Sequence, residues 1–293
     1  EIDQMIEWSL ASVHMVAALH RTKPEFYNHF GEFESSMMGL VDERGALDFY
    51  HGGLRAVDNT GKTIFDHVDY STYEEVLEEQ AKSWSYMKFP HIRSLGAEQG
   101  WYKVGPLARV QACDFIPSPL ADLERKKMMA LGHGKPVMGT LFFHWARLIE
   151  VLHAAELIRD LLDDPDILGT DLMADKGTRK GEAVGVIEAP RGTLFHHYRV
   201  NEDDQVTFCN LIVSTTNNNQ AMNEAIRSVA RTYLDGREVT EGLLNHIEVA
   251  IRAYDPCLSC ATHALGQMPL EVDLVDADGR LVSRGRRNMG PAA

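Results

Sequence analysis

The stretch Asp255-Pro-Cys-Leu-Ser-Cys-Ala-Thr-His263 is the most informative part of the chain. Its pattern is C-x-x-C-x-x-H, in which Cys257 and Cys260 stand three positions apart and His263 follows three positions later. Thiolates at this spacing can converge on one metal ion, and imidazole is another common ligand type. The pattern indicates thiol chemistry at this point of the fold, and several kinds of site are compatible with it.

Each of these kinds of site makes a different demand on the chain. A structural zinc site needs four ligands, and the chain has no second C-x-x-C or His pair of suitable spacing. A thioredoxin-type pair should open a helix after a strand, whereas this pair closes a helix, and covalent haem attachment requires His directly after the second Cys. Two buried thiols without chemistry are an ordinary alternative. The remaining alternative is a metal site in which these two thiolates are completed by ligands from outside this motif.

Two predicted helices lead up to the cysteines. Apolar residues recur every three or four positions across 222–233 and again across 243–254, where Thr240 has the residue type of a helix cap. Pro256 disfavours helical geometry in the residue before it, so the second helix should stop at Asp255. We therefore expect Cys257 to follow directly on a rigid helix end.

The rest of the chain combines long helical patterns with short alternating ones. Together they predict a mainly helical fold with small β regions, that is, an α+β fold. The expected helices are 2–20, 72–84 and a long one through 148–162 that ends before Pro165; the expected strands lie in a hairpin within 47–67, at 184–188, 193–200 and 206–213, and in a hairpin within 270–283.

Composition narrows the class of protein. The 293 residues carry 43 acidic and 29 basic side chains, a balance that argues against a nucleic-acid partner, and no apolar run is long enough to span a membrane. Four cysteines are too few for a disulfide framework, so we expect a reducing, cytoplasmic setting. The first residue is Glu1 rather than Met, from which we expect that the natural N-terminus is missing.

Several segments together resemble the large subunit of nickel-iron hydrogenases. The Asp255 to His263 stretch is similar to the C-terminal signature of that family, and Glu188-Ala-Pro-Arg-Gly-Thr-Leu-Phe-His196 is similar to its second active-site segment. Family landmarks are also matched, in the usual order, by Gly105-Pro-Leu-Ala-Arg109, Gly134-Lys-Pro136 and His144-Trp-Ala-Arg-Leu-Ile-Glu150. The continuation Ala264-Leu-Gly-Gln-Met-Pro269 resembles the cytoplasmic, NAD-reducing branch.

The resemblance implies a role for each candidate residue. Cys257 would be a terminal nickel ligand and a proton relay, and Cys260 would bridge nickel and an iron that carries diatomic ligands. His263 would bind magnesium. The remaining candidates are Asp255, Pro190 and Arg191, which would roof the open metal position, and His196, which would either move protons or orient its neighbours.

The resemblance also implies an activity and a set of partners. The expected reaction is the reversible cleavage of dihydrogen, with electrons passing to an iron-sulfur small subunit and on to NAD through a diaphorase. NAD should not bind here, because no G-x-G-x-x-G follows a strand. Residues 1–263 would be the C-terminal portion of the large subunit. Residues 264–293 would be a maturation tail, cut between His263 and Ala264 by an endopeptidase after nickel-insertion proteins have acted.

One departure from the family pattern keeps a second hypothesis open. The family supplies two further thiolates from an R-x-C-G-x-C segment, which this chain lacks, and Cys113 and Cys209 are isolated. An acidic magnesium ligand should lie in the same missing region. The alternative is therefore a non-catalytic relic, or a scaffold related to the quinone-side subunit of respiratory complex I. Without ligands from another polypeptide, the chain alone could not assemble the active centre.

Overall fold

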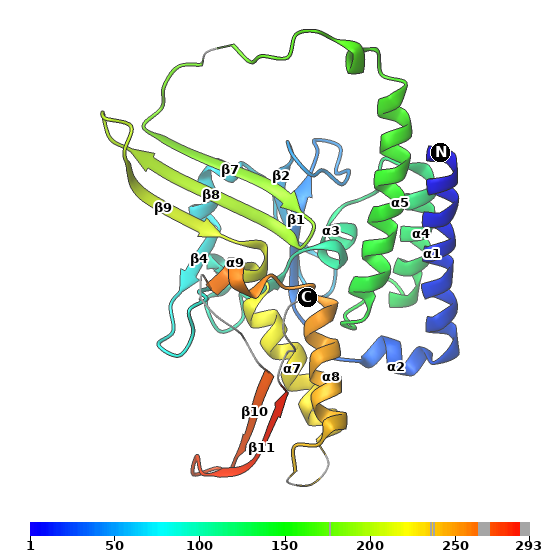
Figure 1. The fold of residues 1–293 in the computed structure, drawn as a ribbon, viewed down its shortest axis with the longest axis vertical. Coiled ribbons are helices and arrows are strands. Elements are labelled where there is room, and N and C mark those ends of the chain that lie inside the picture. Colours follow the sequence, from blue (N-terminus) through cyan, green and yellow to red (C-terminus); the bar gives the residue numbers. More distant parts are fainter. Residues whose placement is uncertain (176, 235, 237, 263–269, 288–293) are drawn as a thin grey trace.

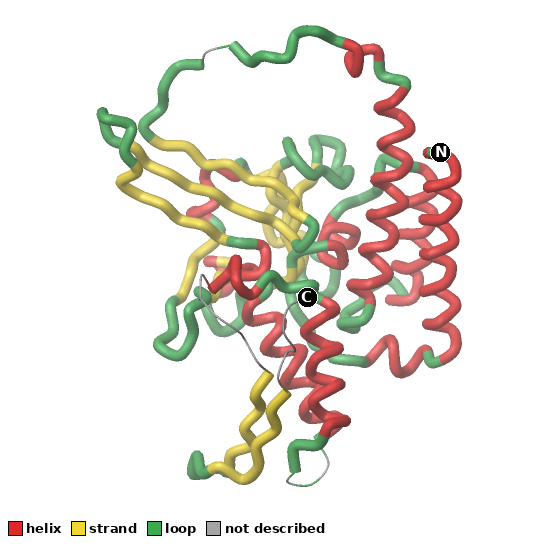
Figure 2. Tube along the Cα trace, in the orientation of Figure 1, coloured by secondary structure: helices red, strands yellow, loops and turns green. Residues whose placement is uncertain are grey.

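The structure is a computed structural model that describes residues 1–175, 177–234, 236, 238–262 and 270–287. Helices account for 43% and strands for 24% of the described residues, which confirms a fold with more helix than strand. A helical layer lies on one side, and the strands gather on the other (Figures 1 and 2).

Groups of helices and groups of strands follow one another along the described residues. Within the described residues the α-helices are α1 (Ile2–Thr22), α2 (Pro24–His29), α3 (Pro106–Ala112), α4 (Pro119–Met129), α5 (Phe142–Leu162), α6 (Ser214–Asn217), α7 (Asn219–Tyr233), α8 (Glu241–Ala253) and α9 (Leu258–Thr262). Short 3-10 helices in the same residues are η1 (Tyr70–Glu75), η2 (Arg93–Leu95), η3 (Ala130–Gly132) and η4 (Pro165–Leu168).

The helical layer is built by α1, α4 and α5, which run side by side in Figure 1. Val13 and Ala17 on α1 and Ile149 and Leu152 on α5 are buried in one shared core, because residues three or four positions apart lie on one face of a helix. The predicted helices 2–20 and 148–162 are confirmed as α1 and as part of α5. Among the described residues no helix combines the length and apolar character needed to cross a bilayer.

The strands form several small sheets. Within the described residues they are β1 (Ser36–Val41), β2 (Gly53–Val57), β3 (Thr63–Val68), β4 (Leu77–Gln80), β5 (Phe89–Ile92), β6 (Tyr102–Lys103), β7 (Glu182–Ala189), β8 (Gly192–Val200), β9 (Val206–Ile212), β10 (Leu270–Val275) and β11 (Leu281–Arg287). One sheet has the order β3-β2-β1-β6, with β6 parallel to β1, and another is the antiparallel meander β7-β8-β9. β4 pairs with β5, and β10 with β11.

The two larger sheets share one hydrophobic core, and the turn between β7 and β8 carries the candidate site residues Pro190 and Arg191. Every residue of β1 is buried, and Met38 packs in one cluster with Phe195 of β8 and Ile212 of β9. The predicted strands at 184–188, 193–200 and 206–213 and the predicted hairpin within 47–67 are confirmed. The sheet β7-β8-β9 therefore presents its β7–β8 turn at a fixed place against the body of the molecule.

The prediction of a helix over 72–84 is wrong. Residues 70–75 form η1, and Leu77–Gln80 is the strand β4, which pairs antiparallel with β5. Tyr73 and Leu77 are four positions apart and both buried, which resembles a helical pattern. Leu77 lies opposite the buried Ile92 in the ladder, so cross-strand pairing outweighs the local preference.

The helices α7 and α8 pack on each other and lead to the cysteines, as predicted. The predicted C-terminal hairpin is also confirmed, as β10 and β11, and it rests on the start of α8. Val239 N donates to Ser283 Oγ at 3.1 Å, and a Cβ on Gly285 would lie 2.5 Å from Val239 Cγ1. The division of the chain between residues 263 and 264 stays a prediction, because residues 263–269 lie outside the described residues.

Candidate metal centre

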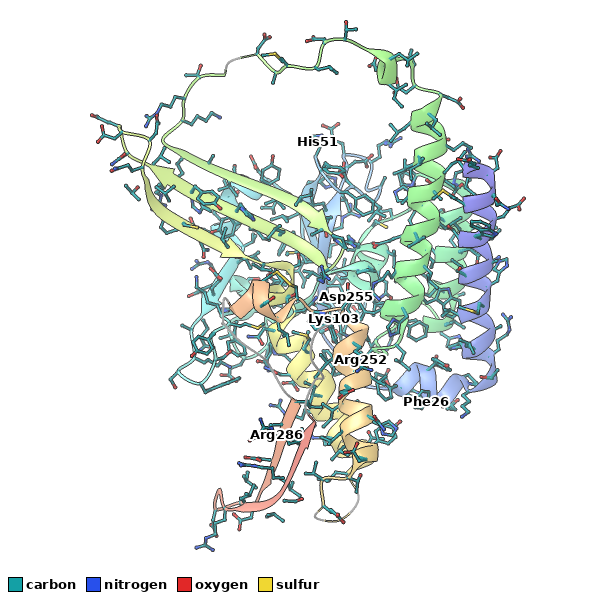
Figure 3. All side chains as sticks on the ribbon, in the orientation of Figure 1. Phe26, His51, Lys103, Arg252, Asp255 and Arg286 are labelled. Atoms are coloured by element: carbon teal, nitrogen blue, oxygen red, sulfur yellow. A yellow bond between two sulfur atoms is a disulfide. The ribbon has the colours of Figure 1, made fainter. Side chains whose placement is uncertain are left out.

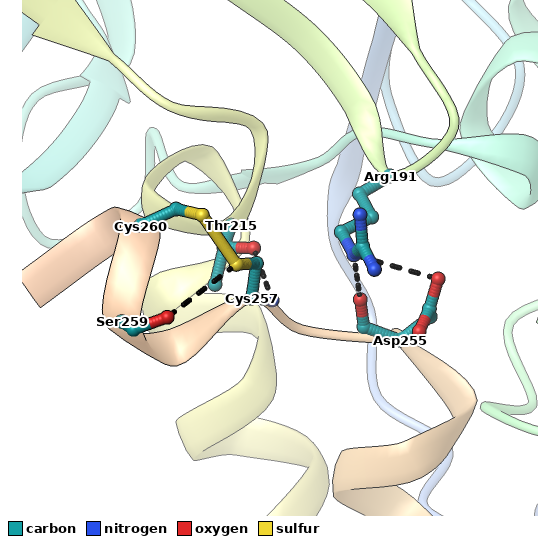
Figure 4. The surroundings of a disulfide bond; sticks show 6 residues. All are labelled: Arg191, Thr215, Asp255, Cys257, Ser259 and Cys260. Carbon is teal, nitrogen blue, oxygen red and sulfur yellow. Dashed lines mark hydrogen bonds and ion pairs between the residues drawn. A yellow bond between two sulfur atoms is a disulfide. The ribbon is translucent and has the colours of Figure 1, made fainter.

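Cys257 and Cys260 lie where α8 gives way to α9, and in the structure they form a disulfide (Figure 4). Their Cα atoms are 5.4 Å apart, within the usual range for such a bond. A metal dithiolate makes a similar demand on the backbone, since both require the two cysteine side chains to lie on the same side and near each other. The sulfurs of the disulfide occupy the place of two thiolates, and metal binding would require the reduced, deprotonated pair.

The sequence pattern predicts that the pair closes a helix; the pair does follow α8, but it also stands at the start of another helix. Cys257 directly precedes α9, and Cys260 lies within it, so the pair also opens a short helix. Residues i and i+3 lie on one side of a helical turn, which explains how the two side chains meet. Because α9 follows a helix rather than a strand, its setting still differs from that of a thioredoxin-type pair.

The link between α8 and α9 is sharply bent and well anchored. Asp255 has φ +50°, a left-handed conformation that is uncommon outside glycine, and Pro256 prevents α8 from continuing. Beyond the bend, Cys257 N donates to Thr215 Oγ1 at 3.0 Å, and Thr215 is buried in α6. The first cysteine is therefore fixed by its backbone before any ligand contributes.

Arg191 and Asp255, separated by 64 positions in the sequence, meet beside the cysteines (Figure 4). Arg191 Nε donates to the Asp255 carbonyl at 2.5 Å and lies 3.4 Å from Asp255 Oδ2. The side chains are 38% and 48% exposed, so the ion pair adds little stability. What the contact does provide is a fixed direction for the guanidinium group. In Figure 3, Asp255 lies near the middle of the molecule, where the helical layer and the sheets come together.

Pro190 and Arg191 form the turn between β7 and β8, since Ala189 pairs with Gly192 in the ladder. The turn touches the start of α3 through backbone atoms. A Cβ on Gly105, which has φ +92°, would lie 2.6 Å from Arg191 O, and a Cβ on Gly192, with φ +138°, would lie 2.8 Å from Gly105 N. Only glycine allows both the conformation and this close approach.

A buried charge cluster that the sequence analysis did not identify lies directly behind the turn. Arg109 of α3 is 2% exposed, and its Nε and Nη2 donate to the two carboxylate oxygens of Glu150, each at 2.7 Å. Its Nη1 donates to Glu188 Oε2 at 2.8 Å and to the Ala189 carbonyl at 2.6 Å. Burial alone would lower the pKa of Arg109, but the two carboxylates outweigh burial and raise it.

The residues of this cluster come from three separate family landmarks in the sequence: 105–109, 144–150 and 188–196. Each landmark was visible, but nothing in the sequence pairs a charge on one with a charge on another 40 to 80 positions away. Glu188 also accepts from Leu40 N at 3.1 Å and from Thr193 Oγ1 at 2.7 Å. The cluster therefore ties α3, α5 and both strands of the turn together.

A second group missed by sequence reasoning is the buried polar run 214–219. Ser214 Oγ donates to the Gly192 carbonyl at 2.6 Å, and the Asn218 amide accepts from Val104 N at 2.9 Å while donating to Val104 O at 3.2 Å. A succession of Ser, Thr and Asn ordinarily indicates an exposed loop. Here every one of these residues is buried, and the side chains satisfy backbone groups at the edges of the site.

His196 is not brought to this centre. It is exposed on β8, with Nδ1 3.1 Å from the Tyr198 hydroxyl, five strand residues and roughly 16 Å beyond Arg191. His144 is within electrostatic range of Asp255: burial and then the charge of Arg147 lower the pKa of His144, and the charge of Asp255 opposes them. Arg147 itself donates to the Ala253 carbonyl at 3.0 Å, at the end of α8.

The two other cysteines do not add ligands. Cys113 is buried, and burial raises the pKa of its thiol to about 11, while Cys209 is exposed on β9. In the described ranges no three His, Cys, Asp or Glu side chains are grouped closely enough to hold a metal ion. His263 and Ala264 lie outside the described residues. The described donor set is thus a pair of sulfurs, which suits a soft metal but does not complete a coordination shell.

Comparison with known proteins identifies the family. The family model described as nickel-dependent hydrogenase matches residues 27–263, which is more than half of the chain. The chain belongs to the nickel-dependent hydrogenase family. It is 46% identical over 289 residues to the NAD-reducing hydrogenase HoxS subunit beta of Cupriavidus necator, covering 98% of this chain and 59% of that protein.

Other hydrogenases agree with this assignment. A subunit of the F420-non-reducing hydrogenase of Methanococcus voltae is 42% identical over 247 residues, covering 82% of the chain and 51% of the relative. The crystal structure of an NAD⁺-reducing [NiFe]-hydrogenase in the H2-reduced state matches with a TM-score of 0.85 at 46% identity, over 89% of this chain and 58% of that one. The chain thus spans somewhat more than half the length of the relatives it matches.

Proposed function

We propose that the chain is the C-terminal, nickel-binding portion of the catalytic subunit of a nickel-iron hydrogenase, which cleaves dihydrogen reversibly into a hydride and a proton. The observation that supports this most strongly is the juxtaposition of Cys257 and Cys260 with the Arg191–Asp255 contact. Family membership supplies the expected group, and the sulfur pair has the ligand chemistry that nickel and iron accept.

The residues present fit half of such a centre. Cys257 and Cys260 would hold the metals, and two further thiolates would have to come from outside this chain, in accord with the length of the relatives. The bound group would supply the electrophilic site at which dihydrogen is split. Magnesium bound by His263 and diatomic ligands on the iron belong to the same proposal.

Side chains of this chain would accept a proton and hold a positive charge close to the metals. Cys257, as a thiolate, would accept a proton beside the metals, because a coordinated thiolate is the nearest base. Arg191 would remain a fixed positive charge, since guanidinium does not titrate in ordinary settings, and Asp255 would hold it over the open position. His196 would serve proton movement or orientation only at a distance from this centre.

Partners follow from the similarity to a subunit of an NAD-reducing hydrogenase. We expect electrons to leave through an iron-sulfur small subunit and a diaphorase, in the cytoplasm. We also expect nickel-insertion proteins and a maturation endopeptidase, which would cut between His263 and Ala264.

The second candidate is a non-catalytic relic or scaffold related to the quinone-side subunit of complex I. It is favoured by one observation: the described residues offer a sulfur pair but no cluster of three metal-binding side chains. The two candidates differ in whether the assembled protein splits dihydrogen.

Isotope exchange tests the proposal without any electron acceptor. The full-length protein should be purified with its partners from a maturation-competent host and incubated with D2 in H2O. Heterolytic cleavage releases HD, and we expect exchange in the wild type that is abolished in Cys257→Ser. Cys209→Ser changes an exposed cysteine of β9 and should exchange at the wild-type rate. A wild type without exchange, beside an active control hydrogenase from the same host, would favour the scaffold.

A further inference from the structure

We infer that Arg109 is a positioning residue for Arg191: by holding the carbonyls of Ala189 and Pro190, it sets the direction in which the Arg191 guanidinium leaves the β7–β8 turn. This inference rests on the proposed hydrogenase function only for its kinetic consequences. The structural part concerns contacts within the described residues.

The first support is the completeness of the Arg109 contacts. A guanidinium has five N–H bonds. Nε and one Nη2 proton go to Glu150, one Nη1 proton goes to Glu188, and the remaining two go to the carbonyls of Ala189 at 2.6 Å and Pro190 at 3.4 Å. Two carboxylates orient the planar group, which leaves its other two donors aimed at the turn.

The second support is what those carbonyls control. The Pro190 carbonyl belongs to the same planar peptide unit as the Arg191 nitrogen, so its orientation sets the start of Arg191. The next carbonyl, that of Arg191, packs against Gly105, where a Cβ would approach to 2.6 Å. The turn is therefore held between the Arg109 side chain and the backbone at the start of α3.

The third support is the contrast between the two arginines. Arg109 is 2% exposed with its donors filled, whereas Arg191 is 38% exposed and meets Asp255 at its Nε. A long, partly exposed side chain loses orientation readily if its backbone moves. Misplacement of a reacting group by about 1 Å can lower a rate by about 10²-fold.

The experiment compares Arg109→Lys with the matched control Arg125→Lys in the assembled, nickel-loaded enzyme. Arg125 is also buried, and it donates to the carbonyls of Val110 at 2.6 Å and Cys113 at 2.5 Å, away from the turn. Lysine keeps the charge but cannot hold two carboxylates and two carbonyls at once. We expect kcat to fall about 10²-fold in Arg109→Lys, with little change in the KM for dihydrogen. In Arg125→Lys kcat should stay at the wild-type value.

A double-mutant cycle separates positioning from general damage. If Arg109 acts through Arg191, the variant Arg109→Lys/Arg191→Lys should be no slower than Arg191→Lys alone, within about twofold. If the two losses multiply, or if Arg109→Lys keeps the wild-type kcat, the inference is overturned.

A structural readout makes the test independent of catalysis. Amide hydrogen exchange in a peptide that covers 188–195 should be about tenfold faster in Arg109→Lys than in the wild type and unchanged in Arg125→Lys. Equal protection in all three proteins would overturn the inference even if the hydrogenase proposal holds. Faster exchange in Arg109→Lys alone, in a protein that shows no D2 exchange, would support the positioning role while the proposed function fails.

A milder variant covers the case in which Arg109→Lys does not fold or load nickel. Glu150→Gln keeps the side-chain length while weakening one anchor of Arg109. We expect the same faster exchange at 188–195 and a smaller loss of kcat, about tenfold, that again does not multiply with Arg191→Lys. Wild-type exchange and kcat in Glu150→Gln would count against the inference.

Discussion

Arg191 is held at both ends, by its backbone in the β7–β8 turn and by its Nε at Asp255. The choice of arginine matters at this residue, since its planar group has a direction that a lysine ammonium lacks. The Asp255 carbonyl can accept from it because Asp255 lies beyond the end of α8, where carbonyls have no partner within the helix. Asp255 also has an uncommon backbone conformation two residues before the cysteine pair, and such conformations are concentrated at functional sites.

At the same scale, His153 should make the subunit sensitive to acid. It is buried beside Phe49, with Nδ1 2.7 Å from Ser118 Oγ, and burial lowers its pKa from 6.5 to about 4. The unfolded state binds a proton first as pH falls, so stability present above pH 6.5 is lost on the way to pH 4. The loss should reach about 3 kcal/mol, measured by urea unfolding at pH 7 and pH 4.

The matched variants for this prediction are His153→Gln and His51→Gln, which changes an exposed loop residue. The first should lose less stability between pH 7 and pH 4 than the wild type, and the second should lose the same amount. An unchanged acid sensitivity in His153→Gln would show that another group is responsible.

At the scale of elements, the centre is assembled from the ends of elements rather than from their middles. The β7–β8 turn, the start of α3, the end of α8 and the polar run at α6 meet at one place. The close contact between the β7–β8 turn and the start of α3 requires glycine at residues 105 and 192. The consequence can be tested with two glycines that share a backbone conformation.

We predict that Gly105→Ala displaces the turn while Gly134→Ala does not. Gly105 and Gly134 have φ +92° and +90°, so both variants pay the strain of a positive φ, about 1–3 kcal/mol. Only at residue 105 would the new Cβ meet the Arg191 carbonyl, whereas nothing lies within 4 Å at residue 134. Thermal unfolding should show a larger loss for Gly105→Ala, and D2 exchange should fall in that variant alone. Equal effects of the two substitutions would contradict the proposed backbone contact.

Element by element, periodicity predicted α1, α5, α7, α8 and the strands of the meander, because their apolar residues repeat over long segments. It failed for β4, where four residues are too few to show alternation and a partner strand decides the outcome. The family resemblance implied that Arg191 and Asp255 belong to one site, and the structure shows the two residues in contact. The resemblance could not predict the Arg109 cluster or the buried run 214–219, since both depend on which distant segments lie against polar side chains.

At the scale of the whole molecule, the described residues form a helical layer and several sheets (Figure 1), and the sulfur pair lies where α8 gives way to α9. The pair lies at an accessible position, with Cys260 exposed, as expected if further ligands approach from outside the chain. The chain spans 59% of the length of the NAD-reducing hydrogenase subunit that it matches. The central claim is therefore that Cys257 and Cys260 bind nickel once the complete protein is assembled.

Metal analysis by mass spectrometry of the assembled protein tests that claim most directly. The account predicts about one nickel per chain in the wild type and in Cys209→Ser, and nickel close to zero in Cys257→Ser and Cys260→Ser, because each removes a thiolate ligand. Nickel retained in both of the latter variants, or absent from the wild type while a control hydrogenase from the same host is loaded, would contradict it.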